Sequence, residues 1–212
     1  MKKAMNQSRL ISILNGISIA ALVLMILLLF VYARTNSQLS TDSENRFNLT
    51  YNANRFMNGS AYLTNEVRAY AATGDQAHYD NYWNEINTLK NRDQGVAAMQ
   101  EIGITKEEQS MIDQMSSISN NLVPLEEQAM ENVQAGKLQE ALNYVYGTEY
   151  TSAITEINAL KEQFLTTLDS RTMEDIQALN IRSSILQGLI YLTLILVAVI
   201  QFFIMTAVKK RI

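Results

Sequence analysis

The sequence predicts an all-α protein in which two transmembrane helices continue into an antiparallel, up-down-up-down four-helix bundle. A single proline and eight glycines in 212 residues favour long uninterrupted helices over strands and loops. Two runs, residues 10–33 and 185–208, are apolar on every side. The segment between them carries apolar residues at three- and four-residue spacing, which is typical of amphipathic helices that bury one face.

Each apolar run is long enough to cross the hydrocarbon core of a bilayer. Both runs contain 15 Leu, Ile, Val or Phe side chains, which favour membrane insertion by roughly 5 to 9 kcal/mol per run. A cleaved signal peptide is the alternative for residues 10–33. That run is longer than the apolar part of a signal peptide, and Ala33 is followed by Arg34 without a clear small-residue cleavage site. We therefore expect an uncleaved anchor.

Basic residues predict the orientation of both spans in the inner or plasma membrane of the cell. They lie before the first span and after the second: Lys2, Lys3, Arg9, Lys209, Lys210 and Arg211. By the positive-inside rule both termini are cytoplasmic, and residues 34–184 are periplasmic or extracellular. Without these six, 11 of the 17 basic residues remain against 21 acidic residues, so the exported segment has a net charge of −10.

The first helix is expected to continue from its span to residue 73, where Gly74 ends it. Its apolar seam alternates steps of four and three, as in a heptad repeat: Leu49, Ala53, Phe56, Leu63, Val67 and Tyr70. A second helix, residues 75–102, has a seam that includes Ile86, Leu89 and Val96, although Asp93 also falls on it.

Thr105 and Glu108 form a capping-box pattern that starts the third helix, in which Pro124 should produce a kink. A short helix, residues 137–146, follows between Gly136 and Gly147. The last helix, residues 148–208, contains no proline and is about 90 Å long at the usual helical rise. Its first half is amphipathic, and its second half is the second span.

Four amphipathic helices joined by short connections can bury their seams together as a bundle. Two separate coiled-coil hairpins are the alternative. The expected organisation is a cytoplasmic N-terminus at residues 1–9, a transmembrane helix at 10–33, the bundle at 34–184, a second transmembrane helix at 185–208 and a cytoplasmic end at 209–212.

Three fragments occur in order between the two spans: EVRAYAATGDQAHYDNYWNEINTLKNRDQGV, IGITKEEQSMIDQM and NVQAGKLQEALNYVYGTEYTSAITEI. Together they resemble the four-helix-bundle sensor domain of bacterial methyl-accepting chemotaxis proteins, over residues 38–184. The resemblance implies a ligand-sensing domain, a homodimer, and a cytoplasmic continuation through a HAMP linker into a signalling module. Residues 209–212 would begin such a linker, so the chain is expected to be a fragment or a receptor without its own output.

Few groups suited to catalysis are present. The chain has no cysteine and one histidine, His78, and no nucleophile has a recognisable base nearby. Adjacent carboxylates, such as Glu107 with Glu108 and Glu126 with Glu127, point in different directions on a helix and are expected on solvated faces. We expect no enzymatic activity, catalytic residue, metal site or cofactor, and a net charge of −10 makes nucleic acid an improbable partner.

Aromatic residues gather at the membrane-distal end of the bundle when its helices are folded up and down. Tyr and Trp combine apolar bodies with polar tips, which suits a pocket for a small organic ligand, and an arginine there could pair with a carboxylate. The hypothesis assigns ligand binding to Arg68, Tyr70, Tyr79, Trp83, Tyr144 and Tyr150. The alternative is that the aromatics only close the end of the core.

Small and polar residues in the spans predict how they pack. Ser12, Gly16 and Ala20 recur every four residues and form a face that allows another helix to approach closely. We expect that face to contact the first span of a partner copy or the second span. Asn15 and Gln201 lie at similar depth and are expected to form a hydrogen bond.

The sequence therefore predicts a transmembrane receptor of the chemoreceptor type. Its exported bundle would bind a small molecule, directly or through a ligand-carrying binding protein, and move the last helix by about 1 to 2 Å to signal to a cytoplasmic module. One alternative is the sensor half of a histidine kinase or a cyclic-dinucleotide enzyme. The other is a structural tether that holds a partner at the surface and binds no small molecule.

Overall fold

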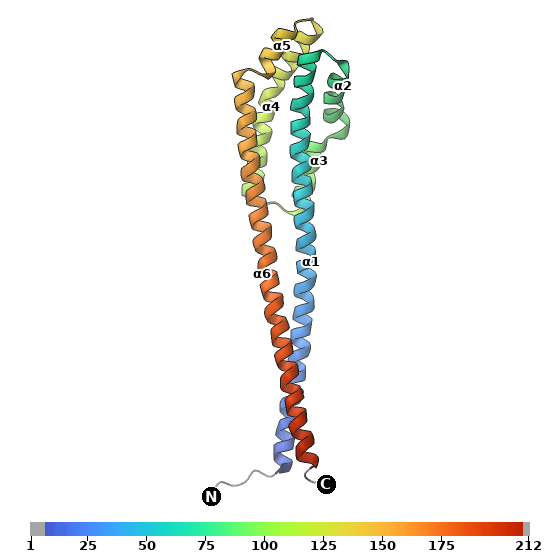
Figure 1. The fold of residues 1–212 in the computed structure, drawn as a ribbon, viewed down its shortest axis with the longest axis vertical. Coiled ribbons are helices and arrows are strands. Elements are labelled where there is room, and N and C mark those ends of the chain that lie inside the picture. Colours follow the sequence, from blue (N-terminus) through green and yellow to red (C-terminus); the bar gives the residue numbers. More distant parts are fainter. Residues whose placement is uncertain (1–6, 210–212) are drawn as a thin grey trace. The chain divides into compact units, whose positions relative to one another are not determined.

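The computed structural model describes residues 7–209, and that part of the chain contains helices and no strand, so the all-α prediction is confirmed. The elements are α1 (Gln7–Thr73), α2 (Gln76–Asn84), the π-helical turn η1 (Glu85–Leu89), α3 (Asn91–Ile102), α4 (Lys106–Gln134), α5 (Leu138–Val145) and α6 (Thr148–Lys209) (Figure 1). Four of the basic residues used to predict orientation, Lys2, Lys3, Lys210 and Arg211, lie outside the described residues.

The chain forms two compact units. The first contains residues up to 43 together with those from 174 onward, and the second contains residues 44–173. Helices α1 and α6 contribute to both units. The division lies about three helical turns inside the domain boundaries expected from the sequence, at residues 34 and 184.

The first unit pairs the beginning of α1 with the end of α6. Its buried residues follow a heptad spacing on both helices: Ala21 and Thr35 on α1, and Leu179, Thr193 and Ile200 on α6. Both helices contain a stretch long and apolar enough to cross a membrane. Large apolar side chains point outward from these stretches, and Phe30 and Leu192 are 68% and 66% exposed. A lipid bilayer would cover such a surface.

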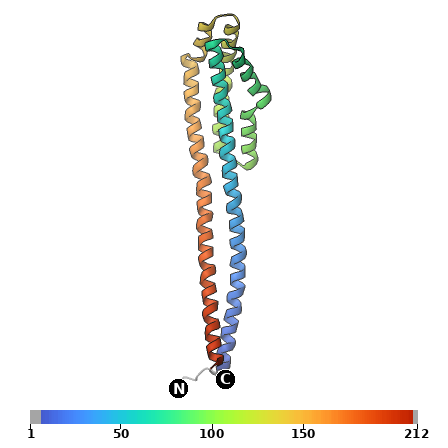
Figure 2. The same ribbon diagram turned by 45° about the vertical axis from the view of Figure 1, so that its right-hand side comes forward.

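The second unit packs the remaining helical segments around two apolar clusters. In both ribbon views α2 and α3 follow one side of α1, while α5 lies across the ends of α4 and α6 (Figures 1 and 2). One cluster includes Val67, Tyr82 and Tyr150, and the other includes Phe56, Met115 and Phe164. The heptad seam predicted for α1 is confirmed: Leu49, Ala53, Phe56, Leu63, Val67 and Tyr70 are all buried.

The second predicted helix is broken, which corrects the expectation of one helix over residues 75–102. Helix α2 passes into the π-helical turn η1, and Lys90 then adopts the left-handed conformation with φ 49° before α3 starts. Ile86 and Val96 of the expected seam pack against the apolar clusters, but the buried Glu85 and Gly95 each lie one residue earlier. Leu89, expected inside, is 43% exposed, whereas Glu85, Gly95 and Met99 are buried.

The other predicted helix ends agree with the structure. Gly74, Gly103, Gly136 and Gly147 all lie between helices. The capping box at the start of α4 is present: Thr105 Oγ1 accepts from the Glu108 amide at 3.1 Å, and Glu108 Oε2 accepts from the Thr105 amide at 2.8 Å. Pro124 lies inside α4, where a kink remains a prediction.

Candidate ligand-binding site

A cavity of about 230 Å³ lies inside the second unit. Its wall includes members of both apolar clusters, among them Phe56 and Met115 from one and Leu63 and Leu122 from the other. The cavity therefore occupies the place where the two clusters meet and the packing between them is incomplete. Residues from α1, α2, η1, α3, α4 and α6 contribute to its wall.

Glu126 is the one carboxylate among the residues that line the cavity, and it is 6% exposed. Its Oε2 accepts a hydrogen bond from the Tyr82 hydroxyl at 2.6 Å, and its Oε1 accepts one from the Tyr150 hydroxyl at 2.6 Å. The two tyrosines come from α2 and α6, so a carboxylate of α4 joins three helices. Both of its oxygens are occupied by this pairing.

Burial and the neighbouring Glu126 charge raise the pKa of both tyrosines well above the ordinary value of 10.0. Burial contributes more than the carboxylate does. Tyr82 and Tyr150 therefore stay protonated and continue to donate to Glu126 at every pH at which the fold persists.

Arg68 contributes the first of three cationic side chains in the cavity wall. Its Nε donates to the Val145 carbonyl at the end of α5 at 3.0 Å. Its guanidinium lies 4.8 Å from the ring centre of Tyr146 and 5.2 Å from that of Tyr150. Stacking against two rings and a helix C-terminus stabilises the charge without a carboxylate partner.

Arg92 of α3 and Lys161 of α6 supply the other two cations. Within residues 7–209 neither forms an ion pair. The Arg92 Nε is buried and has no hydrogen-bond partner in the described part of the chain. Gly59 makes room for this side chain, because a Cβ there would lie only 3.0 Å from the Arg92 Cγ.

Five of the six residues predicted to bind ligand lie outside the wall of this cavity. Three of them stack in a row, with ring centres 5.4 Å apart for Tyr70 and Tyr79 and 6.2 Å apart for Tyr79 and Trp83. Tyr144 packs against the apolar cluster that contains Val67 and Tyr82, and Tyr150 is fully buried within that cluster. Of the six, only Arg68 lines the cavity. The structure thus brings the aromatics together mainly as core.

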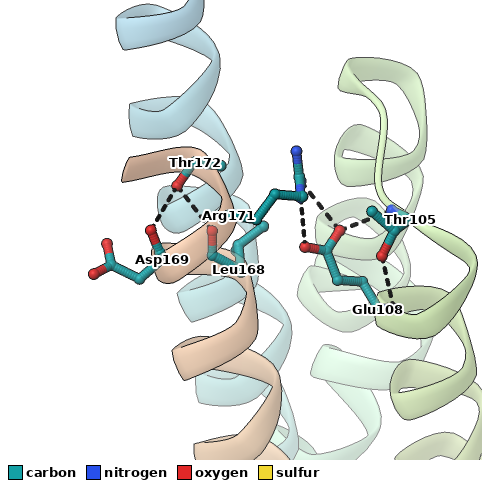
Figure 3. A network of polar contacts seen from close by, with 6 residues as sticks. All are labelled: Thr105, Glu108, Leu168, Asp169, Arg171 and Thr172. Atoms are coloured by element: carbon teal, nitrogen blue, oxygen red, sulfur yellow. Dashed lines mark hydrogen bonds and ion pairs between the residues drawn. The ribbon is translucent and has the colours of Figure 1, made fainter. Parts of the chain in front are cut away.

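The expectation that adjacent carboxylates lie on solvated faces is wrong for Glu108 and Glu126, because both are buried. Glu108 is fully buried and accepts two hydrogen bonds from Arg171 of α6 (Figure 3). Across the described range no group of three His, Asp or Glu side chains could hold a metal ion.

The small-residue face predicted in the first span does not contact the second span. Ser12, Gly16 and Ala20 are all exposed, and a Cβ on Gly16 would have no neighbour within 4 Å. Gln201 donates its Nε2 to Ser18 Oγ at 2.8 Å, so its partner in α1 is Ser18 rather than the expected Asn15.

Sequence reasoning missed Arg92, Lys161 and Glu126. A signal for Lys161 was present, because it occupies a heptad position of the α6 seam, four residues after Ile157 and three before Phe164. A charged residue on a buried seam is expected either to pair or to face a cavity. Arg92 could be placed only once the break at Lys90 was known.

Comparison with protein-family models, with curated proteins and with solved structures gives no match to this chain. The resemblance to chemoreceptor sensor domains therefore rests on the three sequence fragments.

Proposed function

We propose that this chain is a transmembrane sensory receptor of the chemoreceptor type that binds a small molecule in the cavity of its second unit. In this proposal residues 10–33 and 185–208 span the cell membrane, and both termini are cytoplasmic. The second unit then acts as an exported, up-down-up-down four-helix bundle. The receptor works as a homodimer and passes its signal to a cytoplasmic module, as the resemblance implies.

The cavity is the observation that carries the proposal. A core that only holds its helices together is expected to be close-packed and apolar, with few voids larger than a water molecule. Here a cavity of about 230 Å³, partly open to solvent beside the exposed Ala61, Asn65 and Asn158, has Arg68, Arg92, Lys161 and Glu126 in its wall. Apolar walls with a few convergent polar groups are typical of small-molecule sites.

Helix α6 supplies the route by which binding is transmitted. Ile154, Ile157 and Lys161 of this helix line the cavity, and the helix continues without interruption to Lys209. Suppose that α6 can occupy two positions relative to its neighbours. A ligand in the cavity shifts α6 from one to the other only if it binds the protein with different affinity in the two positions. Displacements of about 1 to 2 Å between packed helices are typical of allosteric transitions.

Two alternatives differ in what they need from the cavity. The same sensor could regulate a histidine kinase or a cyclic-dinucleotide enzyme. A carrier protein could also deliver the ligand. Both possibilities still use the cavity as the binding site. A structural tether would not use it. The cation-lined cavity favours sensing over tethering, because a cavity with convergent charged groups is a feature of binding sites that a tether does not need.

Topology can be tested with single cysteines, because the chain has none of its own. A membrane-impermeant maleimide should label Lys106→Cys in intact cells and should label Arg9→Cys only after the cells are opened. Labelling of both variants, or of neither, in intact cells would contradict the proposed orientation.

Sensing can be tested on the full chain in nanodiscs with a metabolite library. A ligand that binds the folded cavity should raise the melting temperature of the wild type. It should not do so in Ser119→Phe, where a ring enters the cavity. The same compound should change the rate at which Asn36→Cys and Ser183→Cys form a disulfide in a double variant. These positions are neighbours on α1 and α6, because Ser183 Oγ donates to Asn36 Oδ1 at 2.9 Å. If no compound meets both conditions, the receptor proposal fails.

A further inference from the structure

We infer that the cavity is built for a small carboxylate with an aliphatic body, whose carboxylate group is bound by Arg92 and Lys161. This inference rests on the proposed function and adds the chemical class of the ligand. It rests on the charge of the cavity wall, on the Arg92 guanidinium, which has no ion-pair partner within residues 7–209, and on the apolar part of the wall.

The charge of the lining is opposite to that of the segment around it. Residues 34–184 contain 11 basic and 21 acidic residues. The cavity wall contains three basic residues, Arg68, Arg92 and Lys161, and one acidic residue, Glu126, which leaves a net charge of +2. Both oxygens of Glu126 already accept tyrosine hydroxyl groups. The cavity wall therefore offers positive charge without a second carboxylate of its own, and the buried Glu85 beside the Arg92 stem uses both oxygens to accept hydrogen bonds from Asn91.

Arg92 is a cation of the cavity wall whose hydrogen-bonding capacity is not fully used by the described residues. The Nε of Arg92 is buried without an acceptor in the described part of the chain, and buried donors are rarely left in that state. A guanidinium presents its Nε and one Nη as a planar fork that matches the two oxygens of a carboxylate. A ligand carboxylate in the cavity would pair with the charge of this guanidinium, and it would also satisfy the Nε if the side chain turned that atom toward the ligand.

The position of Arg92 depends on a missing side chain. Gly59 of α1 faces Arg92, and a Cβ there would lie 3.0 Å from the Arg92 Cγ and 3.1 Å from its backbone nitrogen. An alanine at this position would require the arginine stem and Glu85 Oε1, which would also lie 3.1 Å from the Cβ, to shift by a few tenths of an ångström. Helix α1 thus has a glycine where the Arg92 side chain packs against it.

The rest of the wall favours an aliphatic ligand smaller than a typical drug. Apart from the four charged residues, ten of the sixteen lining residues are apolar, and six of these are leucine, isoleucine or valine, including Leu122, Val123, Ile154 and Ile157. The volume of about 230 Å³ is below the range of roughly 300 to 1,000 Å³ that holds drug-sized ligands. A short carboxylate could place its chain against these residues and its charged group at Arg92 and Lys161.

The test compares matched probes on the full chain in nanodiscs by isothermal titration calorimetry. Butyrate, isovalerate and hexanoate are the carboxylates, each compared with its amide and with the amine of the same carbon skeleton. We expect at least one carboxylate to bind while its amide and amine do not. Arg92→Gln and Lys161→Gln should each weaken that binding roughly tenfold or more. Gly59→Ala should also weaken the binding of that carboxylate, although this variant keeps the arginine at position 92.

Two control variants remove the same charges outside the cavity. Arg182→Gln and Lys106→Gln should leave the affinity unchanged, since both residues are exposed and neither lines the cavity. Binding of an amide or amine that Ser119→Phe blocks would overturn the carboxylate assignment and leave the receptor proposal standing. Binding of no probe, or carboxylate binding that survives both Arg92→Gln and Lys161→Gln, would also overturn the assignment. Topology and disulfide rates decide the receptor proposal separately.

Discussion

Arg171 of α6 holds Glu108 at the start of α4 through two parallel hydrogen bonds, from Nε to Oε1 at 2.9 Å and from Nη2 to Oε2 at 3.1 Å. Glu108 is fully buried and also accepts from the Thr105 amide in the capping box (Figure 3). One carboxylate therefore both begins α4 and fixes the axial position of α6. If ligand binding moves α6 along its axis, this pair has to distort.

Replacing Arg171 with methionine should destabilise the fold. The variant leaves a buried carboxylate with one amide donor, which costs about 3 kcal/mol and should lower the melting temperature by roughly 6 to 12 °C. Adding Glu108→Leu should recover part of the loss, because no charge is then left buried. Thermal unfolding of the full chain in detergent measures both effects.

Arg46→Met is the matched control for that substitution. Arg46 also joins two helices, through Asp169, but the two side chains are 32% and 61% exposed. Its loss should cost less than about 1 kcal/mol. Equal melting temperatures for Arg171→Met and Arg46→Met would show that Glu108 is not held as described.

The tyrosines beside Glu126 predict a loss of stability in alkali. Burial raises the pKa of Tyr82 and Tyr150 above the 10.0 of the unfolded chain. Below pH 10 both states keep the two protons, and the stability from these hydrogen bonds is fully present. Above pH 10 the unfolded chain releases protons that the folded chain retains. The free energy of unfolding should then fall by about 1.4 kcal/mol per pH unit for each tyrosine.

Tyrosinate absorbance and circular dichroism, followed together above pH 10, provide the measurement. Two of the ten tyrosines should ionise only as the helical signal is lost. In Tyr82→Phe with Tyr150→Phe the fold should be weaker at neutral pH, yet its stability should fall less steeply above pH 10. Complete ionisation of all ten tyrosines in a protein that is still helical would contradict the buried pairing.

Gly95 predicts how closely α3 approaches α1. A Cβ at this position would lie 2.7 Å from the Asn52 carbonyl oxygen and 2.8 Å from the Phe56 nitrogen. Both are backbone atoms that cannot rotate away, so Gly95→Ala should cost about 1 to 3 kcal/mol by forcing the helices apart. Gly188→Ala is the control, with no neighbour within 4 Å. Thermal unfolding should separate the two, and equal melting temperatures would rule out the close approach.

Much of the second unit could be predicted because local signals and packing agree there. Glycines end α1 and precede α6 at the expected residues, and the Thr105 capping box starts α4. The break after Leu89 could not be predicted, since Lys90 takes a left-handed conformation that local sequence normally assigns to glycine or asparagine. That one residue displaced the expected seam of the following helix.

The cavity was harder to anticipate than the helices. The bundle expected from the sequence places Tyr70 and Tyr150 near each other, and both belong to one buried cluster. The sequence does not show that these tyrosines fill the core while Arg92 and Lys161 line a cavity. A void remains where the facing side chains are too small to fill the space between the helices. Its size therefore depends on how far apart the helices lie, which the sequence does not give. Only the cation on the α6 seam, Lys161, gave a local sign of it.

The exposed face of the first span predicts the contact between two copies of the chain. Ser12, Gly16 and Ala20 point away from α6, as the exposure of all three indicates. If the receptor is a homodimer that packs through this face, Ala20→Cys should cross-link two copies in membranes under mild oxidation. Gly16→Leu should weaken that cross-link, because close approach needs small residues.

The neighbouring position supplies the control for that experiment. Ala21 is buried within the first unit, so Ala21→Cys should cross-link poorly between copies. Gly16→Leu should not alter the pairing of α1 with α6, because a Cβ there has no neighbour within 4 Å. Its effect on the Ala20→Cys cross-link would therefore report on the partner copy alone. Equal cross-linking at Ala20→Cys and Ala21→Cys would exclude this face as the dimer contact.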